Sequence, residues 1–306
     1  MKISKATRKF ESWLGKRVPL VKPDLDLKHN LMAVDPYSFL RGTFYRWAQI
    51  WEKVCPEIAN APSILAVGDL HVENFGTWRD GEGRLVWGVN DFDETYPMPY
   101  ANDLTRLAVS ANLAVSSGRL RLSSTAISKA ILDGYLAGLE SGGRPFVLEE
   151  QHSWLRTIAL GELRNPEHFW NKMDETPTVK GVPGSARRAL ESSLPEKTLD
   201  YRVAHRVAGV GSLGHERFVA VADWESAKIA REAKAITPSA CAWAYTQKGS
   251  QKTLYPEILE TACRALDPSV HVRGRWLIRR LAPDCSRIEL TDLPTKVDEK
   301  RLLESM

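Results

Sequence analysis

The chain has 306 residues, of which 43% are hydrophobic and 26% charged, which is typical of a globular protein with two lobes or two small domains. Its 42 basic residues nearly balance 38 acidic ones, giving a net charge of +4, whereas a dedicated nucleic-acid binder carries a denser basic excess. We therefore expect no nucleic-acid partner. The chain has no apolar run long enough for a signal peptide or a membrane span, and its four cysteines form no C-x-x-C pair. These features predict a cytoplasmic protein with no membrane partner.

The first part of the chain is mainly helical, because apolar residues recur there at intervals of three and four. In chain order, the predicted elements are helix 36–58, strand 63–67, loop 68–76, hairpin turn 79–83, strand 84–89, helix 103–142, and tryptophan-bearing helical stretches around 149–160 and 166–173. Two polar segments, the loop and the acidic residues after the second strand, interrupt this helical region.

The pattern changes to strands after about residue 199, beyond a loop over 177–184. The elements expected there are strands 201–208, 217–222 and 227–236, helix 255–266, strands 275–281 and 287–290, and a terminal helical piece 298–306. This change divides the chain into a helical part, 1–199, and a β-rich part, 200–306.

The loop Gly68-Asp-Leu-His-Val-Glu-Asn-Phe-Gly76 carries the most informative group of residues. Phosphoryl transfer needs a carboxylate near the attacking hydroxyl and oxygen ligands for Mg²⁺ beside the phosphates of ATP. Asp69 and Asn74 can supply both, and Asp91 follows at the end of the next strand with Asp93 in the same turn. The alternative is that these residues only cap turns, where Asp and Asn are common.

His71 lies between these two residues and is a candidate catalytic group. A role in packing or in hydrogen bonding within the loop is the more common explanation of a single histidine.

A second motif, Gly209-Val-Gly-Ser-Leu-Gly214, has the spacing GxGxxG. A dinucleotide-binding loop of this kind opens a helix, but residues 215–224 have the apolar content of a strand. Strand, glycine turn and strand form the nucleotide flap of kinases, where small residues let backbone amides cover the phosphates. Gly209, Gly211, Ser212 and Gly214 are therefore candidate nucleotide-binding residues, the alternative being a glycine-rich hairpin without a ligand.

A cation about twenty residues beyond the glycine turn would complete a nucleotide site. Lys234 is the first candidate and Arg231 the second, with Glu257 or Glu260 of the predicted helix 255–266 as the acidic partner. A lysine on a strand edge can also be an ordinary solvated side chain.

These motifs resemble those of a known superfamily. Gly68-Asp-Leu-His-Val-Glu-Asn74 is similar to the catalytic loop of aminoglycoside and choline phosphotransferases, and the segment around Asp91 is similar to their metal-binding strand end. Pro36-Tyr-Ser-Phe-Leu-Arg-Gly42, the loop after Gly68, the turn around Asp91 and the late glycine motif together resemble the bacterial domain of unknown function 2252.

The resemblance implies an α+β, two-lobed, protein-kinase-like fold with ATP and Mg²⁺ in the cleft. It implies that Asp69 is the catalytic aspartate, that Asn74 and Asp91 are metal ligands, and that the glycine motif is the flap. The order is reversed, because kinases have the flap and lysine before the catalytic loop. A circular permutation, with the helical catalytic lobe first and the β-rich flap lobe second, explains this order without changing the site.

We therefore expect an ATP- and Mg²⁺-dependent phosphotransferase that acts on a hydroxyl acceptor, either a small molecule or a protein. The alternatives are a non-catalytic, pseudokinase-like nucleotide-binding module and an AMP-transferring enzyme. A dimetal phosphoesterase is disfavoured, because no Asp-x-His precedes Gly68 and the seven histidines are scattered. The preferred interpretation requires that segments more than a hundred residues apart enclose one cavity.

Overall fold

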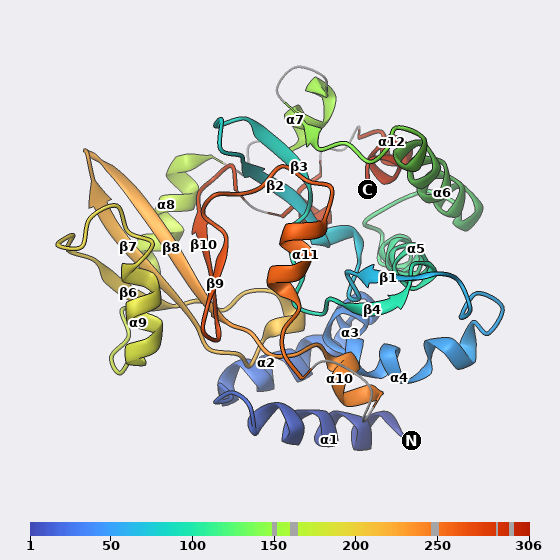
Figure 1. The fold of residues 1–306 in the computed structure, drawn as a ribbon, viewed down its shortest axis with the longest axis horizontal. Helices are drawn as coiled ribbons and strands as arrows, with labels where there is room; N and C mark the ends of the chain where they lie inside the picture. Colours follow the sequence, from blue (N-terminus) through green and yellow to red (C-terminus); the bar gives the residue numbers. More distant parts are fainter. Residues whose placement is uncertain (149–151, 160–164, 246–250, 286, 294–296) are drawn as a thin grey trace.

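The computed structural model describes residues 1–306 except 149–151, 160–164, 246–250, 286 and 294–296. It is a mixed α+β structure, as expected, in which helices and three antiparallel sheets alternate along the chain (Figure 1). None of the helices in the described ranges is both long and apolar enough to cross a bilayer.

Four helices precede the first strand: α1 (Ile3–Gly15), α2 (Lys22–Val34), α3 (Pro36–Gly42) and α4 (Phe44–Val54). The predicted helix 36–58 is in fact α3 and α4, because the backbone leaves the helical region at Thr43. Asp35 caps α3 by accepting hydrogen bonds from the backbone amides of two following residues. The sequence analysis predicted neither α1 nor α2, although α1 has a buried apolar face between charged residues, as an amphipathic surface helix does.

The loop and the acidic turn lie among two small sheets. Strand β1 (Ser63–Ala66) pairs with β4 (Tyr96–Pro99), and β2 (Phe75–Arg79) pairs with β3 (Leu85–Val89), which also pairs with β5 (Phe146–Val147). The strands predicted over 63–67 and 84–89 are confirmed, whereas β4 was not predicted. The end of the predicted loop 68–76 belongs to β2, after a 3-10 turn (Val72–Asn74).

The remaining helices of the first part of the chain are α5 (Ala101–Ser116), α6 (Ser124–Glu140), α7 (Ser153–Ala159), α8 (Pro166–Glu175) and α9 (Gly184–Glu191). The single helix predicted over 103–142 is therefore two helices, with Ser123 as the N-cap of the second. The stretch around 149–160 lies partly outside the described residues, and α9 was not predicted.

A five-stranded sheet with the order β6-β7-β8-β10-β9 forms the last third of the chain. Its strands are β6 (Arg202–His205), β7 (Arg217–Trp224), β8 (Ala227–Ala235), β9 (His271–Arg273) and β10 (Trp276–Leu281), and the accompanying helices are α10 (Ala240–Ala244), α11 (Tyr255–Thr261) and α12 (Glu299–Glu304). Four predicted strands are confirmed. The fifth, 287–290, is wrong, because Arg287 forms only an isolated bridge and a 3-10 turn begins at Leu290.

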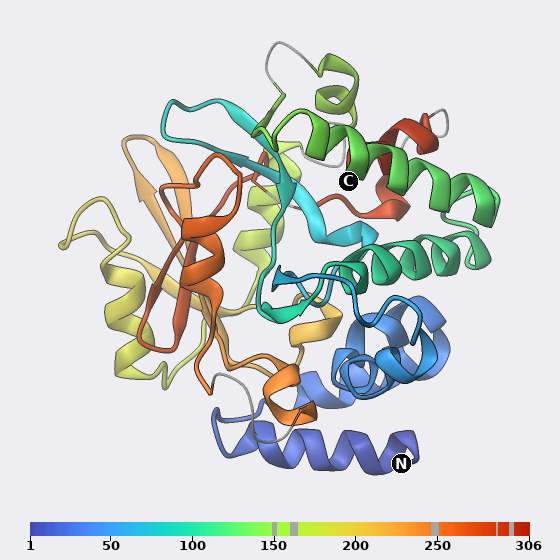
Figure 2. The same cartoon turned by 45° about the vertical axis from the view of Figure 1, so that its right-hand side comes forward.

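The two faces of this sheet differ in chemistry. Phe218, Ala233 and Ile278 share a register and pack with α9 in the largest apolar cluster. Because successive side chains of a strand point to opposite faces, Glu232 and Lys234 lie on the other face. That face is turned toward the loop after β1, and Figure 2 shows the sheet and the helical region on either side of the segment that carries this loop.

Candidate functional site

The loop after β1 is held in place by the first turn of α5. The carboxylate of Asp103 accepts hydrogen bonds from the amides of Val67 and Gly68, at 2.7 and 3.0 Å, and Asn102 donates to the carbonyl of Gly68. Gly68 has φ +81°, and a Cβ there would lie 2.3 Å from the carbonyl oxygen of Glu94, so only glycine fits. The position of Asp69 is therefore fixed by backbone and helix together.

Asp69 forms an ion pair with Arg106, the next charged residue on the same face of α5. The guanidinium of Arg106 is fully buried and donates to Oδ1 of Asp69 from Nε, at 2.8 Å, and from a terminal nitrogen. It also donates to the carbonyl of Leu40 at 2.8 Å, which ties α3 to the loop. Burial raises the pKa of Asp69, and the charge of Arg106 opposes that rise.

Asn74 links the two segments that carry the candidate metal ligands. Its amide nitrogen donates to the carbonyls of Asp69 and Asp91, at 3.2 and 3.1 Å. Because both partners are acceptors, the orientation of the amide is fixed, and its buried Oδ1 has no hydrogen-bond partner among the described residues. An unpartnered buried amide oxygen beside a carboxylate suits a hard cation. Within the described ranges, no three His, Cys, Asp or Glu side chains form a metal site by themselves.

Lys234 extends from β8 to the acidic turn. Its Nζ lies 3.0 Å from Oδ2 of Asp91 and also contacts the carboxylate of Asp93. Burial would raise the pKa of Asp91, but the charges of Lys234 and Arg279 outweigh it and hold that pKa well below the ordinary value. Burial and the neighbouring charge of Asp91 raise the pKa of Asp93. The side chain of Lys234 is fully buried, whereas that of Asp91 is 42% exposed, so the lysine lies behind the carboxylates.

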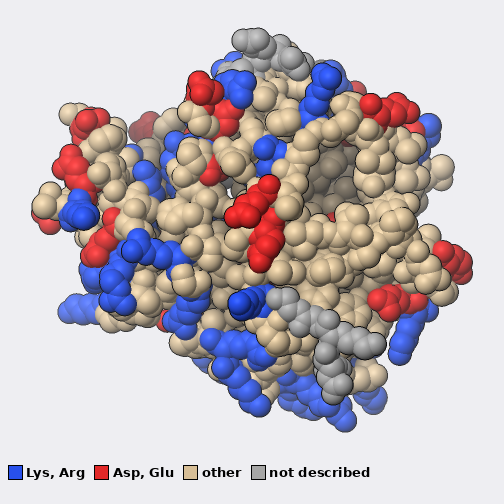
Figure 3. All heavy atoms as spheres, viewed as in Figure 1, with Lys and Arg blue, Asp and Glu red and all other residues tan. Residues whose placement is uncertain are grey.

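The structure does not bring Glu257 or Glu260 to this lysine. Both are exposed residues of α11, and Figure 3 shows acidic side chains on the surface over this helix. The helix instead turns its apolar face inward, where Tyr255 packs edge-on against Phe92 of the acidic turn. Arg231 points to the opposite sheet face from Lys234 and donates to the carbonyl of Ser193.

The glycine motif forms a 3-10 turn (Val210–Ser212) between β6 and β7, which lies over the loop after β1. A Cβ on Gly211 would lie 3.2 Å from the carbonyl of Arg41 and 3.5 Å from Oδ2 of Asp69, so the turn approaches the loop closely. The hydroxyl of Ser212 accepts a hydrogen bond from Arg217 at 2.7 Å. Gly214 is the backbone contact to the N-terminal helices, since its carbonyl accepts from the amide of Val21.

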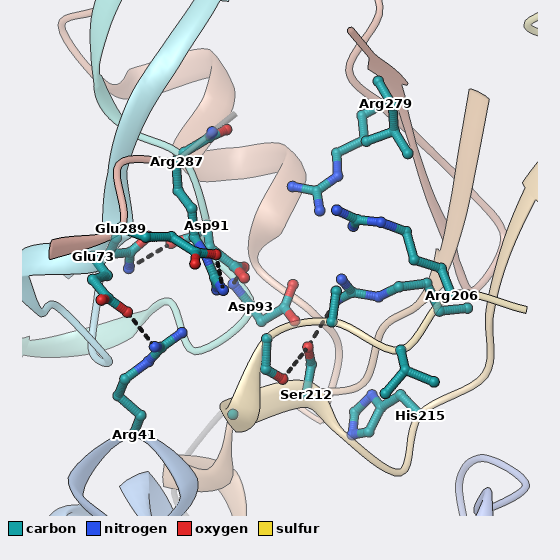
Figure 4. A pocket seen from close by; sticks show the side chains of 18 of the residues that line it. Arg41, Glu73, Asp91, Asp93, Arg206, Ser212, His215, Arg279, Arg287 and Glu289 are labelled. Carbon is teal, nitrogen blue, oxygen red and sulfur yellow. Dashed lines mark hydrogen bonds and ion pairs between the residues drawn. The ribbon is translucent and has the colours of Figure 1, made fainter. Parts of the chain in front are cut away.

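A cavity of about 920 Å³ connects these segments. Its walls include most of the predicted site residues: Asp69, His71, Asn74, Asp91, Asp93, Gly209, Gly211 and Ser212. Gly214, Lys234 and Glu257 are not part of its wall. In Figure 4, Asp91 and Asp93 lie between Arg287 on one side and Arg206 and Arg279 on the other.

The sheet face of the cavity carries a charged cluster that the sequence analysis did not single out. Glu232 is fully buried and pairs with three arginines, one from beyond β6, one from β7 and one from β10: Arg206, Arg217 and Arg279. Burial would raise the pKa of Glu232, but the three guanidinium groups hold it well below its ordinary value. The cluster has three positive charges for one negative charge, so this wall is suited to an anion.

His71 is buried, and its Nδ1 has no hydrogen-bond partner in the part of the chain that the structure describes. Burial and the nearby charge of Arg41 hold its pKa well below the ordinary value, so the imidazole is neutral at physiological pH. A neutral ring at the cavity wall can accept a proton or a hydrogen bond from a ligand.

The comparisons with known proteins concern the part of the chain that contains the loop after β1. Residues 20–143 match the model of a family described as an uncharacterized protein conserved in bacteria, DUF2252. This segment includes α3, the loop and the acidic turn, which are three of the four motifs on which the resemblance rested, whereas the glycine motif at residues 209–214 lies outside the matched residues. No curated protein and no solved structure matches the chain.

Proposed function

We propose that the protein is an ATP- and Mg²⁺-dependent phosphotransferase that acts on a hydroxyl acceptor. The observation that carries this proposal is that Asp69, Asn74 and Asp91 line the same cavity as the turn at Gly211, more than a hundred residues later in the chain. Phosphoryl transfer depends mainly on positioning and charge stabilisation, and these are the groups that it requires.

Asn74 and Asp91 fit a magnesium ion. The unpartnered Oδ1 of Asn74 and the half-exposed carboxylate of Asp91 are oxygen donors, and the low pKa keeps Asp91 ionised. Mg²⁺ is usually bound by one or two carboxylates together with phosphates rather than by a full protein cage. When bound, it would neutralise charge on the phosphate oxygens.

Asp69 is the group that would orient the acceptor. Because Arg106 binds Oδ1, the other oxygen, Oδ2, is the one beside Gly211 at the cavity. An acceptor hydroxyl would donate to this oxygen. Raised by burial, the pKa of Asp69 favours uptake of the hydroxyl proton as the new phosphate ester forms.

The cations of the cavity wall would contact the phosphates. Arg206, Arg217 and Arg279 lie on the sheet face below the glycine turn, where backbone amides can also cover an anion. Lys234 would act behind them by keeping Asp91 and Asp93 together, since it does not reach the cavity surface.

We further propose a two-lobed, kinase-like fold in permuted order, with residues 1–199 as the catalytic lobe and 200–306 as the nucleotide lobe. In kinases the lysine lies on the third strand, after the glycine-rich loop between the first two. Here the glycine turn connects β6 and β7, and Lys234 is on β8, the third strand of the sheet. Helix α9 lies before residue 200 in the chain but packs on this sheet, so it is an exception to the division at residue 200.

Nucleotide-dependent thermal stabilisation tests the proposal, because a ligand that binds the native state raises its melting temperature. We expect MgATP to stabilise the wild-type protein and Asp91→Ala to lose the part that depends on Mg²⁺. The matched control is Asp223→Ala, which changes an exposed carboxylate on β7. If MgATP leaves the wild-type melting temperature unchanged, the proposal fails.

One observation favours a second candidate, a module that binds nucleotide without transferring phosphate. The charge of Arg106 opposes the rise in the pKa of Asp69, so Asp69 is a weaker base than its burial alone would make it. Asp69→Ala separates the two functions once an acceptor is found: a transferase loses turnover but keeps MgATP binding, whereas a binding module has no turnover to lose.

A further inference from the structure

Lys28 is a buried cation that has no role in the function proposed above. It lies on α2, is 7% exposed, and lines the cavity. Its Nζ donates to the carbonyl oxygen of Gly211 at 2.7 Å, and no ion pair of this lysine occurs within the described residues.

The absence of a carboxylate partner distinguishes Lys28 from the other buried cations of the cavity. Arg41 pairs with Glu73, and Arg217 lies 3.7 Å from the carboxylate of Glu232. A buried charge without a counter-ion is costly, and burial accordingly lowers the pKa of Lys28. An ammonium group has three hydrogens, so two remain for a ligand after the bond to the glycine turn.

The position of Lys28 indicates which part of a nucleotide it would meet. Gly211, to which it is bonded, is the residue of the turn that approaches Oδ2 of Asp69. Asp69 marks the place where an acceptor would attack the terminal phosphoryl group.

We propose that Lys28 binds the terminal phosphate of the nucleoside triphosphate through Nζ, and so connects the glycine turn with the group that is transferred. This inference rests on the proposed function. It assigns a phosphate-binding residue to the N-terminal helices, outside both the catalytic loop and the five-stranded sheet. A bond made only by the third phosphate would also make the site prefer a triphosphate to a diphosphate.

The test compares the binding of two magnesium complexes, a non-hydrolysable ATP analogue with a nitrogen between its last two phosphates and ADP, by calorimetry. We expect Lys28→Met to weaken the binding of the triphosphate analogue on the order of tenfold to a hundredfold, as for loss of a charged hydrogen bond. The affinity of the same variant for ADP should change less than about twofold. The matched control is Lys22→Met, an exposed lysine on the same helix paired with Asp26, which should change neither affinity.

The outcomes separate the inference from the function on which it depends. If the wild-type protein binds neither magnesium nucleotide, the proposed function fails. If it binds both and Lys28→Met keeps the preference for the triphosphate, or loses both ligands equally, the role of Lys28 is refuted while nucleotide binding stands.

A second measurement does not depend on the folding of a variant. An ATP derivative acylated on its terminal phosphate transfers its acyl group to a nearby lysine amine and releases ATP. With the wild-type protein, peptide mapping should find the new amide on Lys28. Labelling of other lysines without Lys28 would overturn the inference.

Discussion

Nζ of Lys234 lies 3.0 Å from Oδ2 of Asp91, although 143 positions separate the two residues in the chain. The pair connects the five-stranded sheet to the acidic turn at the end of β3. It also explains how two aspartates can lie together in a buried turn, since the ammonium group contacts both carboxylates.

Replacing Lys234 should affect stability and nucleotide binding together. Lys234→Met removes a fully buried charge and leaves Asp91 and Asp93 to repel each other, so we expect a loss on the order of 3 kcal/mol in the free energy of unfolding. Urea unfolding measures the loss, and thermal shift measures the weaker effect of MgATP. Lys228→Met, on the same strand but partly exposed, is the control and should have a small effect. Equal losses in the two variants would contradict the role of the pair.

A side chain at Gly211 should prevent the close approach of the turn to the loop. A Cβ there would lie 3.2 Å from the carbonyl of Arg41, so Gly211→Ala must push the turn away from Asp69. We expect a loss of about 1–3 kcal/mol in stability, as in other overpacked sites, together with weaker MgATP binding. Gly81→Ala is the control, because a Cβ at Gly81 meets no atom within 4 Å. Unchanged nucleotide affinity in Gly211→Ala would mean that the turn is not part of the site.

Removing the charge of Glu232 should leave three arginines without their counter-ion. We expect Glu232→Gln to lower the free energy of unfolding by about 3–5 kcal/mol at neutral pH. Because the folded pKa of Glu232 is depressed, its contribution is present above the unfolded value of about 4.5 and is lost as pH falls toward the folded value. The difference between wild type and variant should therefore shrink in acid.

Urea titrations at pH 7 and below pH 4 measure this difference. Glu257→Gln is the informative control, since Glu257 is the partner that the sequence indicated for the lysine and is exposed on α11. If Glu257→Gln destabilised the protein as much as Glu232→Gln does, the prediction that Glu257 is the acidic partner of Lys234 would be restored.

His215 should make the protein sensitive to mild acid. Its Nδ1 lies 3.0 Å from the carbonyl of Ala235, and burial lowers its pKa to about 4, with Lys28 and Lys234 adding to the effect. The stability contributed by the neutral ring is complete above the unfolded pKa of about 6.5 and is lost as pH falls toward 4.

Measured by urea unfolding, the loss from this group should reach about 1–3 kcal/mol between pH 7 and pH 4. His215→Gln should remove that part of the pH dependence, and His168→Gln, at an exposed position, should retain it. A pH profile of His215→Gln identical to that of the wild type would assign the acid sensitivity to other groups.

The loop after β1 could be predicted from the sequence because its pattern of residues is local. Asp69 and Asn74 are five residues apart, and the apolar strand before them and the acidic turn after the next strand are visible as short runs. Four of the five strands of the last sheet were predicted for the same reason, whereas β9 was not. Their order in the sheet and the pairing of β10 with β8 are set by long-range contacts.

The charged residues around the loop could not be recognised in this way. Arg106 and Lys28 are on helices, where a single basic residue ordinarily faces solvent, and only the packing of α5 and α2 buries them. The sequence could have predicted that Glu232 and Lys234 lie on the same face of the sheet, because residues two apart in a strand point to the same side. Glu257 was chosen from its helix alone, and the helix packs with that residue outward.

The largest apolar cluster contains Phe10 and Trp51 from the N-terminal helices as well as Phe218 and Trp276 from the sheet. The parts of the chain before and after residue 200 therefore share one apolar core. Neither part can lose its packing without exposing aromatic rings of the other, so heat or denaturant should melt them in one cooperative step.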